Sequence, residues 1–438
     1  MQELDLSSDR LVSRLLALSE SEPVCILDSC GVSHLGSHLL IAGVRPVETI
    51  EISNDDPTKT LSYFDSYLAR NKACIFTVSY DLGLRLEGIP KRKNAIDTPS
   101  EPDLFLAVFD GLIVHDYDTG KTFITGDAGS VERLLTDSPE SVAREHIALE
   151  VNSNFSRNEY LTVIGEIKEL IRSGDTYQTN LTQRLEVRLH DQQKPQQIFH
   201  RLRKNHPAPF AAFIQRKDST VISASPERFV SVTGETIETS PIKGTRPRGA
   251  SSREDEALRN ELLASEKDRA ENTMIVDLLR NDLGRICEYG SVRVGKLCEL
   301  EEHPTLFHLV STVSGKLTNH VRPSDLLKAI FPCGSITGAP KHRTMHIIDQ
   351  IETADRGLSM GAIGINIPNS GPWTLDTGLQ MSVAIRTMVI RKNLASFNVG
   401  GGIVIDSDPE KEYEESLLKA QALLDALGFG NSTKAFGV

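Results

Sequence analysis

One lysine stands in a segment that could aim its amine at a substrate, Pro241-Ile242-Lys243-Gly244-Thr245. The proline before Lys243 and the glycine after it set the backbone on either side. A lysine amine becomes a nucleophile when burial or nearby positive charge lowers its pKa. Arg246 and Arg248 follow closely, so the pentapeptide by itself is also compatible with a solvated basic loop. The sequence therefore offers a candidate nucleophile that other residues have to support.

Two pairs of acidic residues have the spacing of one helical face. Asp268 and Glu271 lie in a segment predicted to be helical over about 266–283, and Glu412 and Glu415 lie in a helix predicted to begin after residue 408. Side chains three residues apart on a helix are neighbours. Two such pairs on separate helices could jointly hold a hard divalent cation such as Mg²⁺ through carboxylate oxygens and water. Each pair alone could equally be a solvated acidic face.

Two glycine-rich segments could receive carboxylates. Residues 334–341, Gly-Ser-Ile-Thr-Gly-Ala-Pro-Lys, precede a predicted helix with Pro340 at its start, and Gly400-Gly401-Gly402 follows a predicted strand. Free backbone N–H groups and the dipole of a helix N-terminus favour an anion. Neither segment is a P-loop, because neither has the Gly-x-x-x-x-Gly-Lys-Ser/Thr pattern. Both could also be ordinary tight turns.

Four further polar residues stand in positions where chemistry is possible. Glu227 could act as a general acid, or it could form a surface ion pair with Arg228. His308 begins a strand-like run and Gln178 lies in a predicted strand, where most such residues are structural. Arg386 lies inside a predicted apolar strand, and a charge there is costly unless it meets an anion.

Local patterns predict the elements that must position these residues. Short apolar runs bounded by turn residues predict strands at 24–27, 73–78 and 104–109. A capping box at Ser156–Glu159 predicts a helix that ends at Ser173-Gly174, and a strand follows over 176–189. We also predict a helix over 130–150, and helices and strands alternate from there to about residue 428. The expected organisation is a β-rich region over 1–150, a catalytic region over 151–430 and a loose tail over 431–438.

The composition bounds the class of protein. The chain has 438 residues, of which 39% are hydrophobic and 25% charged, as is typical of soluble globular proteins. A formal charge of −12 disfavours binding to a nucleic-acid backbone, and no apolar run reaches the roughly 20 residues that span a bilayer. No signal peptide is expected at the N-terminus, and six cysteines without a Cys-x-x-Cys pair indicate reduced thiols in a cytoplasmic protein. A small anionic substrate would need a local cation.

Taken together, these segments resemble the chorismate-utilising enzymes. The resemblance is strong over about 155–427 and weaker before that, for example at Ser-Tyr-Asp-Leu-Gly (79–83). Several strings in the family's order make a chance match very unlikely. The motifs are Ser-Pro-Glu-Arg-Phe (225–229), Pro-Ile-Lys-Gly-Thr (241–245), Asp-Arg-Ala-Glu-Asn (268–272), Gly-Ser-Ile-Thr-Gly-Ala-Pro-Lys (334–341) and Gly-Gly-Gly-Ile-Val (400–404) leading to Glu412-Tyr413-Glu414-Glu415.

The resemblance implies a fold and a metal. The expected fold is α+β, with two stacked antiparallel β-sheets flanked by helices. The expected cofactor is Mg²⁺, which holds the ring carboxylate of chorismate. By motif position the metal region falls on Asp268, Glu271, Glu412 and Glu415, with direct ligation expected from Glu271 and Glu415. Many relatives carry glutamate where Asp268 stands, and the shorter side chain favours a role through water.

The resemblance also implies substrate contacts. Arg386, Lys419 and the backbone N–H near Gly402 are expected to meet the enolpyruvyl carboxylate, and Thr337 and His308 to line the ring, with Thr245 also in the substrate site. The N-terminal part of the family often holds a tryptophan-sized pocket. By resemblance it would be formed by Ser29, Gly36, Ser37, His38, Leu39, Pro209, Phe210 and Ala211.

Two positions indicate the branch of the family. Isochorismate and salicylate synthases place a lysine base where Gln178 stands, and a neutral amide cannot activate water in this way. Anthranilate synthases typically have alanine where Lys243 stands. The chain thus resembles the aminodeoxychorismate branch of 4-aminobenzoate and folate biosynthesis. There Lys243 would attack C2 of chorismate while Glu227 protonates the departing C4 hydroxyl, and ammonia would then attack C4.

The source of ammonia and two alternative functions remain open at this stage. The cysteines lack the Gly-x-Cys-x-Gly setting of a glutaminase nucleophile, so we expect a separate glutamine amidotransferase subunit. The first alternative is an anthranilate synthase component I, which needs no amine at position 243. The second is a non-catalytic regulator that binds chorismate or an amino acid. The presence of Glu227, Lys243 and all four acids of the metal region argues against the second.

Overall fold

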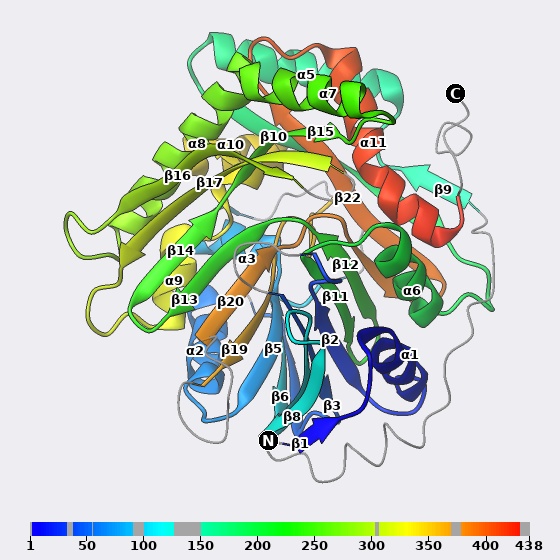
Figure 1. Ribbon diagram of the computed structural model, residues 1–438. Helices are drawn as coiled ribbons and strands as arrows, with labels where there is room; N and C mark the ends of the chain where they lie inside the picture. The colour runs from blue at the N-terminus through cyan, green and yellow to red at the C-terminus, as the bar shows by residue number, and fades with distance from the viewer. Residues whose placement is uncertain are drawn as a thin grey trace.

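The short apolar runs of the sequence become strands of two large antiparallel sheets, which are stacked and flanked by helices (Figure 1). The computed structural model describes residues 2–32, 38–54, 56–90, 100–126, 150–302, 306–368 and 378–429. Within these residues the arrangement is the α+β fold that we expected. The strands predicted at 73–78 and 104–109 have those bounds, and the strand predicted at 24–27 extends to Asp28.

The first sheet has 12 strands in the described residues. Their order is β1 (Gln2–Leu4), β8 (Lys121–Gly126), β7 (Gly111–Asp116), β3 (Leu39–Val44), β2 (Val24–Asp28), β11 (Phe210–Gln215), β12 (Thr220–Ser225), β21 (Thr387–Arg391), β22 (Leu394–Ile403), β10 (Gln178–Arg188) and β18 (Gly338–Ala339), and β9 (Glu150–Ser153) also pairs with β10.

The second sheet has 10 strands in the same part of the chain. Their order is β15 (Ile242–Pro247), β17 (Leu306–Lys316), β14 (Thr236–Ser240), β13 (Arg228–Thr233), β20 (Gly378–Val383), β19 (Ala362–Ile367), β5 (Ala73–Val78), β6 (Leu104–Phe109) and β4 (Glu48–Ile52), and β16 (Arg293–Glu302) also pairs with β17.

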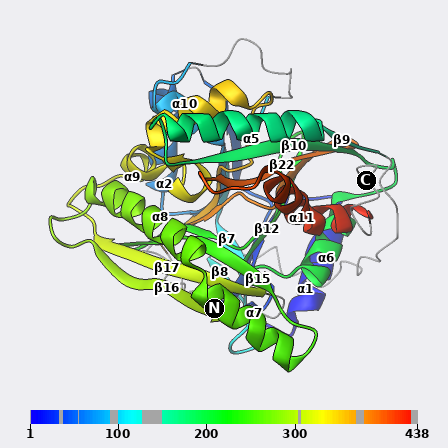
Figure 2. The ribbon, with the colours of Figure 1, turned by 90° about the horizontal axis from the view of Figure 1, so that it is seen from above.

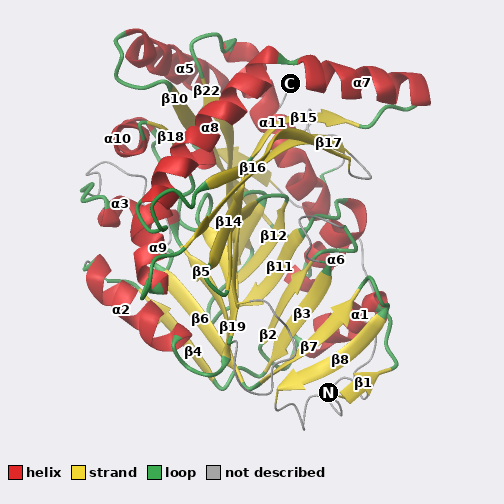
Figure 3. Cartoon of the chain, turned by 60° about the vertical axis from the view of Figure 1, so that its left-hand side comes forward, coloured by secondary structure: helices red, strands yellow, loops and turns green. Residues whose placement is uncertain are grey.

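Helices cover the outer faces of both sheets (Figure 3). They are α1 (Ser8–Leu18), α2 (Pro57–Leu68), α3 (Tyr80–Leu86), α5 (Arg157–Arg172), α6 (Pro195–Asn205), α7 (Ser252–Ala264), α8 (Glu266–Gly284), α9 (Pro323–Ile330), the 3₁₀ turn η1 (Gly334–Ile336), α10 (Lys341–Ile351) and α11 (Pro409–Leu427). The predicted capping box is present, because Ser156 caps α5 and Glu159 returns the hydrogen bond. Pro340 precedes α10 as its N-cap residue.

The alternation of side chains along the strands divides the core into layers. On β5, Cys74, Phe76 and Val78 pack under helices, whereas Ala73 and Ile75 face the first sheet. Successive side chains of a strand point to opposite faces, so a strand buried on both faces is apolar throughout. This explains why these segments appear in the sequence as continuous apolar runs.

Strands from the first 150 residues and from the rest of the chain share both sheets. β2 pairs with β11 in the first sheet, and β5 pairs with β19 in the second. A boundary near residue 150 stays a prediction, and the predicted helix over 130–150 and tail over 431–438 lie outside the described residues, apart from residue 150 in β9. All six cysteines are free thiols, as expected. No helix in the described residues is long and apolar enough to cross a membrane.

Candidate active site

Glu227 and Arg386 lie on two neighbouring connections between the sheets. The chain passes from β12 to β13 through Pro226-Glu227 and returns from β20 to β21 through residues 384–386. The Val383 N–H donates to the Glu227 carbonyl at 3.0 Å, so the two crossovers lie side by side. Our prediction that Arg386 lies inside a strand was wrong. The apolar run is interrupted where it changes sheet, and Arg386 adopts a left-handed φ of 47° there.

The Glu227 carboxyl is buried and can carry a proton near neutral pH. Its side chain is in a residue that is only 4% exposed, and burial raises its pKa to about 7. The Ser335 hydroxyl donates to Glu227 Oε1 at 2.7 Å, and this bond and the charge of Lys243 act in the opposite direction. A carboxylic acid with a pKa near the working pH can serve as a general acid. Sequence reasoning missed Ser335, although it lies in the motif over 334–341.

A bulge in β15 aims the Lys243 side chain. Ile242 pairs with Val310 and Thr245 with His308, so β15 has one residue more than β17 between these pairs. Gly244 takes a φ of +88°, and a Cβ there would lie 2.9 Å from a Leu262 methyl carbon. Bulges redirect side chains and are common beside active sites. The glycine after Lys243 is therefore required both by the backbone conformation and by the lack of space.

The Lys243 amine and the Gln178 amide approach the same point above Gly402. A Cβ built on Gly402 would lie 2.7 Å from Gln178 Nε2 and 3.3 Å from Lys243 Nζ. Gln178 is fully buried, and within the described residues neither its amide nitrogen nor its amide oxygen has a hydrogen-bond partner. An unpaired buried amide costs free energy, on the order of 1–3 kcal/mol per group. The pair of unmet groups indicates that a polar ligand belongs beside Lys243.

Three more predicted site residues lie near this point, and of these His308 and Thr337 are buried whereas Thr245 is exposed. His308 Nδ1 and the Thr245 hydroxyl lie 2.8 Å apart across the β15–β17 pair. Thr337 follows η1, and its hydroxyl donates to the backbone carbonyls of Cys333 and Gly334. The Asn180 N–H, two residues after Gln178, donates to the Thr337 carbonyl at 2.8 Å. The motif over 334–341 is thus joined to the strand that carries Gln178.

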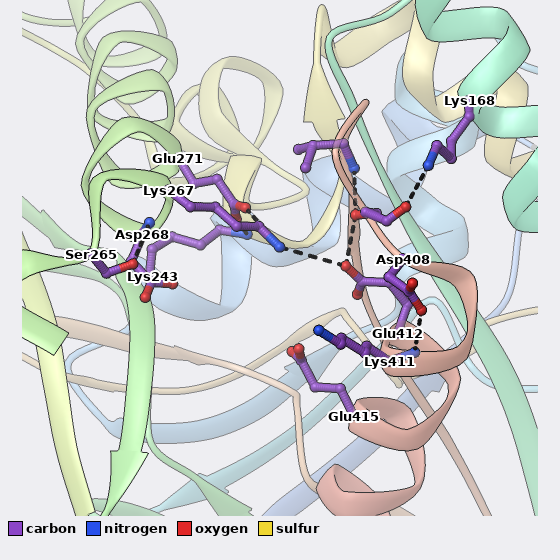
Figure 4. Close-up of polar contacts among 12 residues, drawn as sticks. Lys168, Lys243, Ser265, Lys267, Asp268, Glu271, Asp408, Lys411, Glu412 and Glu415 are labelled. Carbon is purple, nitrogen blue, oxygen red and sulfur yellow. Dashed lines mark hydrogen bonds and ion pairs between the residues drawn. The ribbon is translucent and has the colours of Figure 1, made fainter. Parts of the chain in front are cut away.

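The two helices with acidic pairs face each other across the site, with α8 beside β15 and β17, and α11 beside β22 (Figure 2). Lys267 lies between their carboxylates, 3.9 Å from Glu271 and 3.8 Å from Glu412 (Figure 4). Lys243 Nζ is 3.8 Å from the other oxygen of Glu271. Sequence reasoning missed Lys267, which lies between the motif and the helix cap.

The other two acids have different partners. Asp268 pairs with Arg246 at 3.3 Å, and Glu415 with Lys419 at 2.7 Å. In the described part of the chain, no three acidic, histidine or cysteine side chains gather closely enough to form a metal site as they stand. Ligation by the four predicted acids therefore stays a prediction.

The chemistry of the donor set nevertheless fits Mg²⁺. Burial raises the pKa of Glu271, the charges of Lys243 and Lys267 act against this rise, and the charges of Asp268 and Glu412 add to it, so this carboxylate lies among both ammonium groups and carboxylates. Burial also opposes the charge of Glu415, but Lys419 holds its pKa below the ordinary value. Carboxylate oxygens are the ligands that Mg²⁺ prefers. The Lys267 side chain is 55% exposed, so its ammonium can turn out to solvent at little cost.

Two cations could bind an anion, and one of them lies beside the glycine run over 400–402. Our prediction that this run follows a strand was wrong, because it lies inside β22 and pairs with β10. Lys419 Nζ donates to the Gly400 carbonyl at 3.0 Å and lies 3.4 Å from the position of a Cβ on Gly401. Burial lowers the pKa of Arg386, and among the described residues no carboxylate offsets this effect. A guanidinium without a carboxylate partner is suited to an anionic group of a ligand.

The described residues of the predicted N-terminal pocket lie where β2, β3 and β11 meet. The Ser29 N–H donates to the Leu39 carbonyl at 3.0 Å, and Ala211 pairs with Asp28. His38 stacks at a tilt on Tyr117, with ring centroids 5.2 Å apart. Pro209 and Phe210 directly precede Ala211, whereas Gly36 and Ser37 lie outside the described residues. The pocket and its tryptophan ligand stay predictions.

Comparison with known proteins shows which family and which proteins this chain is similar to. Residues 22–425 match the family of chorismate binding enzymes. Aminodeoxychorismate synthase component 1 of Bacillus subtilis is 38% identical over 367 residues, which cover 80% of this chain and 76% of that protein. The Escherichia coli protein of the same name is 35% identical over 420 residues, covering 93% and 88%. The solved structure of anthranilate synthase component I from Streptococcus pneumoniae superposes with a TM-score of 0.76 at 29% identity, covering 90% and 93%.

Proposed function

This chain belongs to the chorismate binding enzymes, and from that membership we propose that it aminates chorismate at C4 to give 4-amino-4-deoxychorismate. The observation that carries the proposal is the surroundings of Lys243. Its amine comes to the same point as the unpartnered Gln178 amide, and the protonatable Glu227 carboxyl lies within its electrostatic range. A nucleophile, a general acid and a polar contact without a protein partner are what the first step needs.

In the first step the neutral Lys243 amine attacks C2 of chorismate. The new N–C2 bond forms, the ring double bonds move from C1–C2 and C5–C6 to C1–C6 and C4–C5, and the C4–O bond breaks. Glu227 gives its proton to the departing oxygen, so that water leaves rather than hydroxide. The burial that raises the pKa of Glu227 to about 7 favours the protonated form that this role requires.

In the second step ammonia attacks C4 from solvent or from a partner. The ring double bonds move back to C1–C2 and C5–C6, the bond between Lys243 and C2 breaks, and the free amine is restored. The proton released by the ammonia nitrogen replaces the one that Glu227 lost. The balance is chorismate and ammonia to 4-amino-4-deoxychorismate and water. The Gln178 amide can bind ammonia or the free Lys243 amine, but it cannot serve as a base that activates water.

Substrate orientation would depend on the cations and acids around the site. Arg386 and Lys419 would bind the enolpyruvyl carboxylate beside Gly402. Glu271 and Glu415, assisted by Asp268 and Glu412, would hold Mg²⁺, which when bound neutralises the ring carboxylate. His308 and Thr337 would line the ring of the substrate. Thr245 would orient His308 through their contact at 2.8 Å.

A mass measurement tests the lysine nucleophile directly. The protein is mixed with chorismate and Mg²⁺ without ammonia, and we expect an adduct of chorismate minus water that maps to Lys243. Lys243→Ala should lose the adduct and lower the single-turnover amination rate by roughly a thousandfold or more. Lys296→Ala, which removes a half-exposed lysine on neighbouring β16, is the control and should leave both unchanged. An undiminished C4 amination rate in Lys243→Ala would refute the assignment.

The alternative function is that of an anthranilate synthase component I, the name of the solved relative with a TM-score of 0.76. That reaction aminates C2 and needs no lysine nucleophile. Incubation with chorismate, Mg²⁺ and ammonium separates the two. Direct release of fluorescent anthranilate would overturn C4 amination.

We also propose a glutamine amidotransferase subunit as the source of ammonia. The name "component 1" of the relatives in Bacillus subtilis and Escherichia coli implies a further component in those enzymes. The proposed product would enter 4-aminobenzoate and folate biosynthesis in the cytoplasm.

A further inference from the structure

A buried ion pair lies outside the site, after the end of α10. Glu352 and Arg356 have side chains that are 2% and 1% exposed. The contact is bidentate, with Nε to Oε2 at 2.9 Å and Nη2 to Oε1 at 2.7 Å. The guanidinium also lies over the Tyr80 ring at 4.6 Å. Burial opposes the charge, yet Glu352 holds the pKa of Arg356 above its ordinary value, so the arginine stays charged.

The remaining donors of Arg356 bind two backbone carbonyls that belong to the active site. Nη1 donates to the Ile336 carbonyl at 3.0 Å, and Nη2 donates to the Asn180 carbonyl at 2.7 Å. Ile336 lies between Ser335, which donates to Glu227, and Thr337. Asn180 lies two residues after Gln178 on β10.

Glu352 binds the same strand from the other side of the pair. Its Oε1 accepts from the Thr182 N–H at 2.7 Å and from the Thr182 hydroxyl at 2.9 Å. The ion pair therefore joins the η1 turn, β10 and the end of α10 by directed hydrogen bonds. These segments are far apart in sequence, and each carries or adjoins a residue of the proposed reaction.

The chemistry of this pair favours a geometric role. Replacing a buried ion pair by apolar residues is often neutral or stabilising, so burial alone does not explain its presence. The planar arginine fork can bind a carboxylate and two carbonyls at fixed angles at once. An ammonium of the same charge lacks that fork.

We propose that Arg356 is a positioning residue that fixes the η1 turn against β10, so that Ser335 holds Glu227 and Gln178 faces Lys243. This inference rests on the proposed function, because Glu227 must be the general acid. Within the part of the chain that the structure describes, the hydrogen bonds of Arg356 go to Glu352 and to backbone carbonyls and not to side chains of the proposed site.

The test compares three variants by single-turnover formation of the Lys243 adduct over a range of pH. This rate constant does not depend on the fraction of folded protein. For Arg356→Lys we expect a fall of roughly ten- to a hundredfold, as for a small misplacement of reacting groups. The alkaline limb of the pH profile, which begins where Glu227 loses its proton, should also move to higher pH. The reason is that a looser Ser335–Glu227 hydrogen bond lowers the pKa of Glu227 less. Besides Ser335, the groups that affect Glu227 are Lys243 and the Ile242 N–H, and Glu227 itself acts on the Cys333 thiol.

Two reference variants make the result specific. Ser335→Ala removes the hydrogen bond directly and should move the limb in the same direction. Arg216→Lys is the matched control, because Arg216 also has a fully buried side chain, pairs with Glu101, donates to Thr77 and lies 5.6 Å from the centroid of an aromatic ring. Arg216→Lys should lower the stability of the protein and leave the alkaline limb of the pH profile unchanged. If Arg356→Lys does not fold, Glu352→Gln should give the same shift.

The outcomes separate the two proposals. If Ser335→Ala moves the limb and both Arg356→Lys and Glu352→Gln behave like Arg216→Lys, the positioning role is refuted and the proposed function stands. If no adduct forms in the unmodified protein, or Ser335→Ala does not move the limb, the proposed role of Glu227 fails first. A shift in Arg356→Lys and Ser335→Ala but not in Arg216→Lys supports the inference.

Discussion

At the scale of single residues, the site depends on giving two ionisable groups different surroundings. Glu227 lies on a buried crossover, where burial raises its pKa to about 7. Lys243 lies on the bulge of an edge strand, with its amine 3.8 Å from Glu271. Environments of this kind allow an acid and a nucleophile to act at the same pH. The sequence names both residues, but it does not state how deeply each is buried.

The pH dependence of catalysis should report Glu227. Its proton is required in the first step, and the protonated fraction falls about tenfold per pH unit above roughly pH 7, so the pH profile of adduct formation should bend downward there. Glu227→Gln keeps the shape but has no proton to give, and we expect it to abolish this step. Stopped-flow or quench measurements between pH 5 and 9 check this, and a rate that rises steadily through pH 9 would contradict it.

The same residue should make stability depend on pH. The unfolded chain loses this proton near the ordinary value of 4.5, and the folded chain loses it near 7. Between these values the folded state binds more protons, so the contribution of Glu227 to stability falls as pH rises through this window. Glu227→Gln removes the penalty and should therefore stabilise the protein above pH 7, by up to about 3 kcal/mol. Urea unfolding at pH 5 and pH 8 measures the difference.

At the scale of elements, two facing helices supply the acidic groups. α8 and α11 come from distant parts of the sequence, and Lys267 bridges Glu271 and Glu412 between them. The sequence predicted the two helices correctly, because the signals of a helix are local. It did not predict that a lysine of α8 would lie between the acids of both helices.

Magnesium binding should respond to these charges. Glu271→Gln and Glu415→Gln should each weaken Mg²⁺ binding, because each removes a charged oxygen ligand. Lys267→Gln should tighten it several-fold, because the competing ammonium is lost. Lys411→Gln is the control, because it removes the same charge at the first turn of α11, next to Glu412 in the sequence (Figure 4). Calorimetric titration with Mg²⁺ alone measures all four, and equal affinities throughout would exclude this site.

At the scale of the whole molecule, the site lies where the chain crosses from one sheet to the other. The crossovers that carry Glu227 and Arg386 lie side by side, while Gln178 and Gly402 come from the first sheet and Lys243 and His308 from the second. The site is thus assembled from both sheets, and no continuous stretch of the chain contains it.

The whole protein should use free ammonia but not glutamine. With ammonium and chorismate we expect 4-amino-4-deoxychorismate from this chain alone. The proposed general acid, the nucleophile and the residues proposed to bind the substrate carboxylates are all present in it. Glutamine should become a nitrogen donor only after addition of an amidotransferase subunit. Chromatography of the product with each donor checks this. Turnover of glutamine by the chain alone would show that the ammonia-producing step was assigned wrongly.

The sequence by itself determined the element types, the chemical groups and their family resemblance. Strands at 73–78 and 104–109 and the cap at Ser156 follow from alternation, turn residues and hydrogen bonds within a few residues. Such signals are local, so they can be recognised without knowledge of the fold.

Only the tertiary structure decided which of these groups meet. Ile75 pairs with Ile365, and Arg356 binds carbonyls at Asn180 and Ile336, because strand partners and buried charges are selected by packing between distant segments. Arg386 looked like part of a strand, since an apolar run does not reveal where the chain changes sheet. The sequence thus supplied the amine of Lys243, and the fold supplied the bulge, the buried acid and the unpaired Gln178 amide beside Gly402 that give this amine a possible role.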